Sequence, residues 1–257
     1  MKFFKLLKYE FLENIASVAL INIVLLILLY FMRFFIYSRT NDLHWILGIF
    51  LSLSPIVIIT SLVFLLNIII KTLYSRLFSK EGYLTLSLPL SIDSILISKI
   101  LISMLWVAIS AFVFWLWLAD IGDRFHFWHK IFRIILENYS LFDILSFVAF
   151  CFIFVLKPII LVMLILSILN IGKINRFRKV IGILLFFVIL SIEYISITSI
   201  YIIVDSIFGT SISPTIPFNP NIETSIFEVI LYLLIYMLPI FVYYFFSRYL
   251  IKNKLEI

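Results

Sequence analysis

The sequence predicts an all-α integral membrane protein with six transmembrane helices, an N-terminal amphipathic helix at the membrane interface, and both termini in the cytoplasm. Hydrophobic residues make up 64% of the 257 residues, and charged residues only 13%. Soluble domains contain roughly 25% charged residues. A soluble domain of this length leaves about a quarter of its unfolded surface exposed, so its core could not hide this much apolar surface. The lipid bilayer is therefore expected to surround most of the chain.

Six apolar runs account for the predicted transmembrane helices. A helix needs about 20 mostly apolar residues to cross the hydrocarbon core. Six runs meet this requirement: residues 15–32, 45–70, 95–118, 144–169, 180–204 and 226–246. They are apolar on all sides, as lipid-embedded helices are. We therefore divide the chain into an amphipathic connecting helix at residues 1–14 and a six-helix transmembrane domain at residues 15–257.

The basic residues are distributed unevenly between the two sets of connections. Most lie in one set: Lys2, Lys5, Lys8, Lys71, Arg76, Lys80, Lys99, Lys173, Arg176, Arg178, Lys179, Arg248, Lys252 and Lys254. The other set carries only Arg33, Arg39, Arg124, Lys130 and Arg133. Because Lys and Arg accumulate on the cytoplasmic side, this bias predicts a plasma-membrane protein with cytoplasmic termini. The net charge of +6 therefore reflects the orientation of the chain in the membrane. A nucleic-acid-binding protein would have its basic residues clustered on a folded surface, whereas here they are scattered along span ends.

The first fourteen residues have the pattern of an amphipathic helix. Aromatic and aliphatic residues recur at helical spacing on one face, and lysines lie largely on the other. The apolar face comprises Phe3, Phe4, Leu7 and Phe11, and the basic face Lys2, Lys5 and Lys8. We expect a helix along the inner membrane surface, with a disordered basic tail as the alternative.

Two further elements are predicted on the outer side. The stretch RFHFWHKIFRIILE, which begins at Arg124, has an apolar stripe against charged residues and predicts a second interfacial helix. Its histidines, His126 and His129, share a helical face, but no carboxylate or thiol completes a metal site, so no metal is expected. The stretch SPTIPFNPN has prolines three residues apart and predicts a stiff turn over the outer mouth.

Motifs for catalysis are absent from the sequence. It contains no H-E-x-x-H and no G-x-S-x-G. A phosphate-binding loop is also missing, because Gly172 and Lys173 are followed by Ile174 and Ser167 stands where the first glycine would fall. The chain is therefore not expected to be an enzyme or to bind ATP by this loop.

Two ionisable residues lie inside predicted spans. Lys157 is in the fourth span and Glu193 in the fifth. An unpaired charge at this depth costs from about 3 to over 10 kcal/mol, so each needs a partner. Counted from the connection between the spans, both lie roughly 21 Å deep at 1.5 Å per residue. Equal depth on neighbouring antiparallel helices predicts an intramembrane ion pair, either structural or in contact with a substrate or gate.

The stretch KEGYLTLSLPLS, residues 80–91, interrupts the apolar pattern between the second and third spans. Ser91 is placed to cap the third helix, with Asp93 in its first turn. Pro89 disfavours a helical conformation in the residue before it. Residues 81–88 then form a short separate element. This element is too apolar for a solvated turn, so we expect a partner to cover it. A re-entrant turn against the chain's own membrane domain is the alternative.

Two of these stretches, with the six spans, carry a resemblance to a known family. The opening FFKLLKYEF and the segment KEGYLTLSLPLSIDSILISK resemble the ABC-2 type permeases, the membrane subunits of ABC exporters. The resemblance implies a coupling helix within residues 78–93 that docks into a separate ATPase subunit. The implied docking residues are Glu81, Gly82, Tyr83, Leu84, Leu86, Leu88 and Pro89. It further implies that a second permease chain, the same or related, faces this one, and that the partner subunit binds ATP and magnesium.

The sequence also departs from this family and leaves alternatives open. The family usually carries its outer re-entrant helices between spans five and six, where this chain has the proline-rich stretch. One alternative is a stand-alone channel or secondary carrier that uses Lys157 and Glu193, although such carriers usually show repeats or glycine-broken spans. Another is a membrane anchor without transport activity. The substrate stays open among peptides, antibiotics, lipids and drugs.

Overall fold

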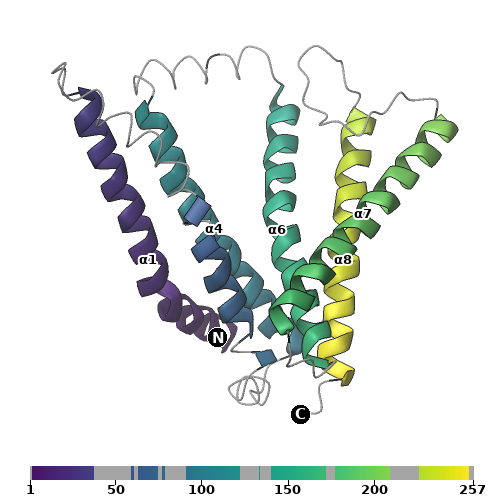
Figure 1. The fold of residues 1–257 in the computed structure, drawn as a ribbon. Coiled ribbons are helices and arrows are strands. Elements are labelled where there is room, and N and C mark those ends of the chain that lie inside the picture. Colours follow the sequence, from purple (N-terminus) through teal and green to yellow (C-terminus); the bar gives the residue numbers. More distant parts are fainter. Residues whose placement is uncertain are drawn as a thin grey trace. The chain divides into compact units, whose positions relative to one another are not determined.

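In the part of the chain that the structure describes, all regular secondary structure is helical. The computed structural model describes residues 2–37, 59–60, 63–74, 77–78, 91–121, 133, 140–171, 177–208 and 226–254. The long helices are α1 (Lys2–Tyr37), α4 (Ile92–Ile121), α6 (Leu141–Ile171), α7 (Arg178–Phe208) and α8 (Ile226–Lys254) (Figure 1). A shorter apolar helix, Val63–Tyr74, precedes α4 in the sequence.

Each of the five long helices contains a stretch that is long and apolar enough to cross a membrane. These stretches are Phe3–Ile27, Ile92–Val113, Leu141–Ile171, Val180–Val204 and Val229–Asn253. They correspond to the first, third, fourth, fifth and sixth predicted spans. Most of the second predicted span, residues 45–70, lies outside the described residues, although Val63–Tyr74 overlaps its end.

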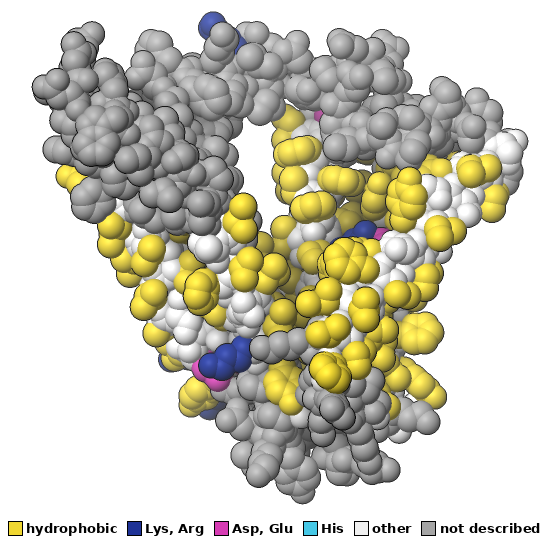
Figure 2. Space-filling model, in the orientation of Figure 1, with side chains coloured by type: hydrophobic (Ala, Val, Ile, Leu, Met, Phe, Trp, Pro, Cys, Tyr) yellow, Lys and Arg dark blue, Asp and Glu magenta, His cyan; other side chains and the backbone are white. Residues whose placement is uncertain are grey.

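The outer surfaces of these helices are apolar. On α7 the side chains of Phe187, Ile195 and Ile202 are 61%, 62% and 70% exposed. Figure 2 shows hydrophobic side chains spread along the described helices on the face in view. Large apolar side chains at such exposure are unfavourable in water and suited to lipid.

Side-chain caps define where two of the helices begin. At α4 the backbone N–H of Ser94 donates to Ser91 Oγ at 3.2 Å, and Asp93 lies in the first turn. The predicted cap of the third span is therefore confirmed. At α6 the N–H of Asp143 donates to Ser140 Oγ at 3.2 Å, and Ser140 N–H donates back to Asp143 Oδ2 at 2.9 Å. This reciprocal pair satisfies backbone donors that the first turn leaves free.

The chain divides into two compact units, Met1–Ile134 and Ile135–Ile257. In the first unit α1 packs on α4. The ring of Phe11 stacks on Trp106 with centroids 4.7 Å apart, and Val18 joins Ile102 and Trp106 in a buried cluster. Glu10 of α1 contacts Ser98 and Lys99 of α4, whereas Val18, two turns further along α1, clusters with Ile102 and Trp106 further along α4, so the two helices run parallel.

The N-terminal residues belong to α1, which is one helix from Lys2 to Tyr37 without interruption at residue 14. Its end nearest the N-terminus bends away from the axis of the rest (Figure 1). The predicted apolar face is divided, because Phe4 is exposed whereas Leu7 and Phe11 pack on the buried cluster. That the first turns of α1 lie along the inner membrane surface remains a prediction.

In the second unit α6 packs mainly on α8, and α7 packs on both. Phe150 of α6 contacts Tyr236 of α8 edge-on, with ring centroids 5.5 Å apart. The ring centroids of Tyr201 on α7 and Tyr232 on α8 lie 5.4 Å apart. A Cβ atom on Gly182 of α7 would lie 3.2 Å from Leu169 of α6, so the glycine allows the two helices to approach closely.

Candidate functional site

The described charges that are buried inside apolar helices form two clusters, one in each unit. We call Lys157, Glu193 and Tyr243 the Glu193 cluster, and Glu10, Ser98 and Lys99 the Glu10 cluster. Both lie in helices long and apolar enough to span a membrane. Ionisable groups in such positions are costly and usually have a function. We therefore treat both clusters as candidate functional elements.

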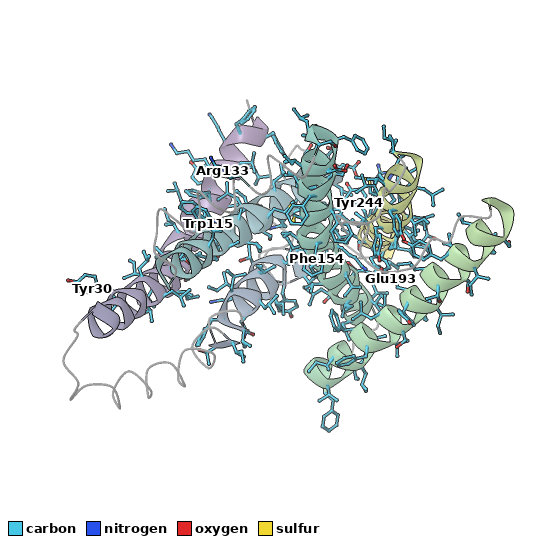
Figure 3. The ribbon with its side chains drawn as sticks, turned by 90° about the horizontal axis from the view of Figure 1, so that it is seen from above. Tyr30, Trp115, Arg133, Phe154, Glu193 and Tyr244 are labelled. Atoms are coloured by element: carbon cyan, nitrogen blue, oxygen red, sulfur yellow. The ribbon has the colours of Figure 1, made fainter. Side chains whose placement is uncertain are left out.

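The Glu193 cluster joins the three helices of the second unit. Lys157 of α6 forms an ion pair with Glu193 Oε1 of α7. The hydroxyl of Tyr243 on α8 donates to Glu193 Oε2 at 2.9 Å. Each carboxylate oxygen thus has a partner on a different neighbouring helix. Figure 3 shows Glu193 on the side of α7 that faces α8.

The ion pair is the one that equal depth predicts from the sequence. Leu169 and Gly182 face each other near the α6–α7 connection, and Lys157 and Glu193 lie almost equal numbers of residues beyond them. Antiparallel helices with equal rise keep this register over the intervening turns. The side chain of Glu193 is 5% exposed and that of Lys157 is 23% exposed, so the lysine is the more accessible member of the pair.

Replacing Tyr243 with phenylalanine is expected to lower the free energy of unfolding by about 1.5–3 kcal/mol. A hydrogen bond to a charged group contributes this much, and the buried carboxylate would lose one of its two partners. Thermal unfolding of the purified chain in detergent would measure the effect. Tyr194→Phe is the matched control, because Tyr194 is 72% exposed on the same unit and should give almost no change. Equal stability of Tyr243→Phe and the native chain would contradict the role of this hydroxyl.

The Glu10 cluster joins α1 to α4 near the start of both helices. Lys99 Nζ lies 3.2 Å from Glu10 Oε1, and the two side chains are 0% and 1% exposed. Ser98 Oγ donates to the carbonyl oxygen of Ile95 at 2.8 Å and lies 3.4 Å from Glu10 Oε2. The ion pair is therefore enclosed by protein, with the hydroxyl as a weak additional partner.

Polar contacts extend from this cluster to the short helix Val63–Tyr74. Asn14 Nδ2 donates to the backbone carbonyl of Glu10 at 3.3 Å. Thr72 Oγ1 lies 3.1 Å from Asn14 Oδ1 and donates at 2.8 Å to the carbonyl of Ile68. The end of the second apolar run is thus linked to the same face of α1 that holds Lys99.

Lys99 does not lie in a cytoplasmic connection, so its place among the basic residues of that set is wrong. It lies inside α4, fully buried and paired with an acid. The orientation bias remains without it. Its position within the third apolar run was the available signal, since an ionisable residue inside a span needs a partner. No comparable signal indicates Tyr243, because an uncharged tyrosine is common in transmembrane helices.

Several predicted site residues lie outside the described part of the chain. These are Glu81, Gly82, Tyr83, Leu84, Leu86, Leu88 and Pro89 of the implied coupling segment, the histidines His126 and His129, and the three prolines of the outer stretch. Among the described residues, no three His, Cys, Asp or Glu side chains gather closely enough to hold a metal ion.

Long apolar helices, lipid-suited surfaces and paired intramembrane charges define an all-α, multi-pass membrane protein. Comparisons of the chain with protein-family models, curated proteins and solved structures found no match.

Proposed function

We propose that this chain is the permease subunit of an ATP-driven ABC exporter. In this proposal the chain lies in the plasma membrane with both termini in the cytoplasm and faces a second permease chain, identical or related. A separate ATPase subunit docks on residues 78–93 and binds ATP and magnesium. The chain itself carries out no catalysis and supplies the path for the substrate.

The observation that supports this proposal best is the Glu10 cluster. Glu10 belongs to the opening FFKLLKYEF, and Ser98 and Lys99 end the segment KEGYLTLSLPLSIDSILISK. These are the two stretches that resemble the ABC-2 permeases. They are far apart in sequence, yet a buried ion pair holds them together.

The same contact provides a route for mechanical coupling. Residues 78–93 lead directly into α4, whose first turn is fixed by the Ser91 cap. Two turns further on, Lys99 is held by Glu10 of α1. A displacement of the docked segment would therefore move α4 and the start of α1 together, because packed helices shift as rigid elements.

Replacement of the docking residues tests the proposal. The variant Glu81→Arg/Tyr83→Ala should lose an ATPase subunit that co-purifies with the tagged native chain from gently solubilised membranes. The reversed charge and the lost aromatic contact would disrupt docking without changing any residue of the described helices. Quantitative mass spectrometry of the co-purified proteins would measure the loss, which we expect to be at least tenfold.

The matched control is Glu13→Arg/Tyr9→Ala, which makes the same two changes on exposed positions of α1. This control should retain the ATPase subunit. Absence of an ATPase from the native chain would contradict the exporter proposal, and equal loss in both variants would contradict docking on residues 78–93.

The Glu193 cluster favours a second candidate, a stand-alone channel or secondary carrier. Charged groups inside membrane helices commonly line the path of an ion or substrate, and Lys157 is partly exposed. This alternative requires flux through the purified chain in vesicles without an ATPase or ATP. The exporter proposal requires no such flux.

A further inference from the structure

We infer that a groove at the C-terminal end of α8, lined by Phe245, Arg248, Tyr249, Lys252 and Asn253, binds the headgroup of an anionic phospholipid. The groove is shallow, with a volume of about 380 Å³. The inference does not depend on the exporter proposal, since it concerns only the end of one transmembrane helix.

The lining residues form one continuous stripe on α8. The positions of Phe245, Arg248, Tyr249 and Lys252 follow the spacing of neighbours on one helix face. Phe245 and Tyr249 are 56% and 55% exposed, Lys252 is exposed, and Arg248 is half-buried. Phe241, 57% exposed, continues the stripe one turn further into the apolar part of the helix. The stripe therefore changes from apolar aromatic to basic along α8.

This gradient matches a phospholipid in both chemistry and length. Lys252 offers a positive donor to a phosphate. Arg248 already has another partner, and its guanidinium, which carries five N–H donors, can add a further hydrogen bond. The amide of Asn253 can donate to glycerol or headgroup oxygens, and the aromatic rings can pack on the first acyl carbons. No acidic side chain lines the groove among the described residues. From Phe245 to Lys252 the helix rises about 10 Å, enough to cross one interfacial layer of roughly 5–8 Å and to reach the first acyl carbons.

Basic residues at the end of a helix also have general effects that must be separated from specific lipid binding. Cations near a helix C-terminus interact favourably with the helix dipole, and Lys and Arg accumulate at cytoplasmic span ends. Both effects act at any basic helix end, and any Lys or Arg near the membrane surface also attracts anionic lipid, by about 1 kcal/mol for each residue. A built site predicts a selectivity for an anionic headgroup that is greater than at other basic span ends.

Native mass spectrometry of the purified full chain tests this selectivity. The probes are phosphatidylglycerol, which is anionic, and phosphatidylcholine, which is zwitterionic with no net charge. Each Lys or Arg near anionic lipid contributes about fivefold in affinity, so two residues predict roughly tenfold to thirtyfold tighter retention of phosphatidylglycerol. The variant Arg248→Gln/Lys252→Gln should lose this preference.

The matched control is Lys5→Gln/Lys8→Gln, which removes two exposed lysines from the start of α1. It should lose much less of the preference than Arg248→Gln/Lys252→Gln does. Equal retention of the two lipids by the native chain would overturn the inference, as would an equal loss in the control variant. Displacement of the lipid by millimolar inorganic phosphate would also overturn it, because the site would then recognise phosphate alone.

A second measurement keeps the native charges and so does not depend on folding of the double variant. Replacing Phe245 with the photoreactive amino acid p-benzoylphenylalanine should yield adducts with phosphatidylglycerol in mixed-lipid vesicles. The same replacement at Phe187, exposed on α7, should label both lipids in proportion to their abundance. Proportional labelling at both positions would contradict a selective site at α8.

Discussion

Replacing Glu10 with alanine is expected to lower the free energy of unfolding by about 3–5 kcal/mol. Lys99 would keep its ammonium in a fully enclosed position without the carboxylate that now lies 3.2 Å away. Removal of one partner from a buried ion pair has this cost because the remaining charge stays desolvated and loses its opposite charge. Thermal or chemical unfolding of the purified chain in detergent would measure the effect.

The double variant Glu10→Met/Lys99→Met separates the charge penalty from the packing. Replacement of both members by apolar side chains of similar length is often neutral or stabilising, so this variant should recover most of the lost stability. Glu13→Ala is the control, since Glu13 is exposed one turn further along α1 and its removal should cost less than about 1 kcal/mol. A Glu10→Ala chain as stable as the native one would show that the pair contributes little.

The double variant also tests coupling under the proposed function. If the ion pair transmits movement from α4 to α1, a stable Glu10→Met/Lys99→Met chain should still bind its ATPase subunit but transport more slowly for each ATP hydrolysed. The apolar contact that replaces the ion pair is non-directional and would allow the helices to slide. Unchanged transport per ATP would assign the Glu10 cluster a purely structural role.

Replacing Glu193 with alanine is expected to be the next most damaging change. The side chain of Lys157 is 23% exposed, so its ammonium can turn toward water or lipid headgroups, and we expect a loss of about 2–4 kcal/mol. The hydroxyl of Tyr243 would lose its acceptor at the same time. Detergent unfolding would again give the change in stability.

The pair Lys157→Met/Glu193→Met distinguishes a structural ion pair from one on the substrate path. A structural pair predicts recovered stability and retained transport. A pair that contacts substrate predicts recovered stability with transport lost, because the apolar replacements cannot bind a polar or charged group. If the double variant stays as unstable as Glu193→Ala, the loss of stability comes from packing and not from the unpaired charge.

The sequence by itself determined the class of protein and the positions of five spans. A helix needs about 20 consecutive apolar residues to cross the lipid, so each span can be recognised from its own residues without knowledge of the others. The same local physics placed the Ser91 cap, which depends only on the first turn of α4. The Lys157–Glu193 pair could also be predicted, because two neighbouring helices joined by a short connection leave depth as the main unknown.

Only the tertiary structure decided which helices pack together and which buried groups meet. Transmembrane helices are apolar on all sides, so no stripe indicates the face that contacts a neighbour. Glu10 met Lys99 because α1 and α4 run parallel in one particular register, across a long separation in sequence. Tyr243 reached Glu193 because α8 packs on both α6 and α7 in one particular rotation. Which helices pack together and which buried groups meet depends on all the helices of a unit, because each must pack closely and each buried polar group must find a partner. The sequence of one apolar run does not determine these contacts.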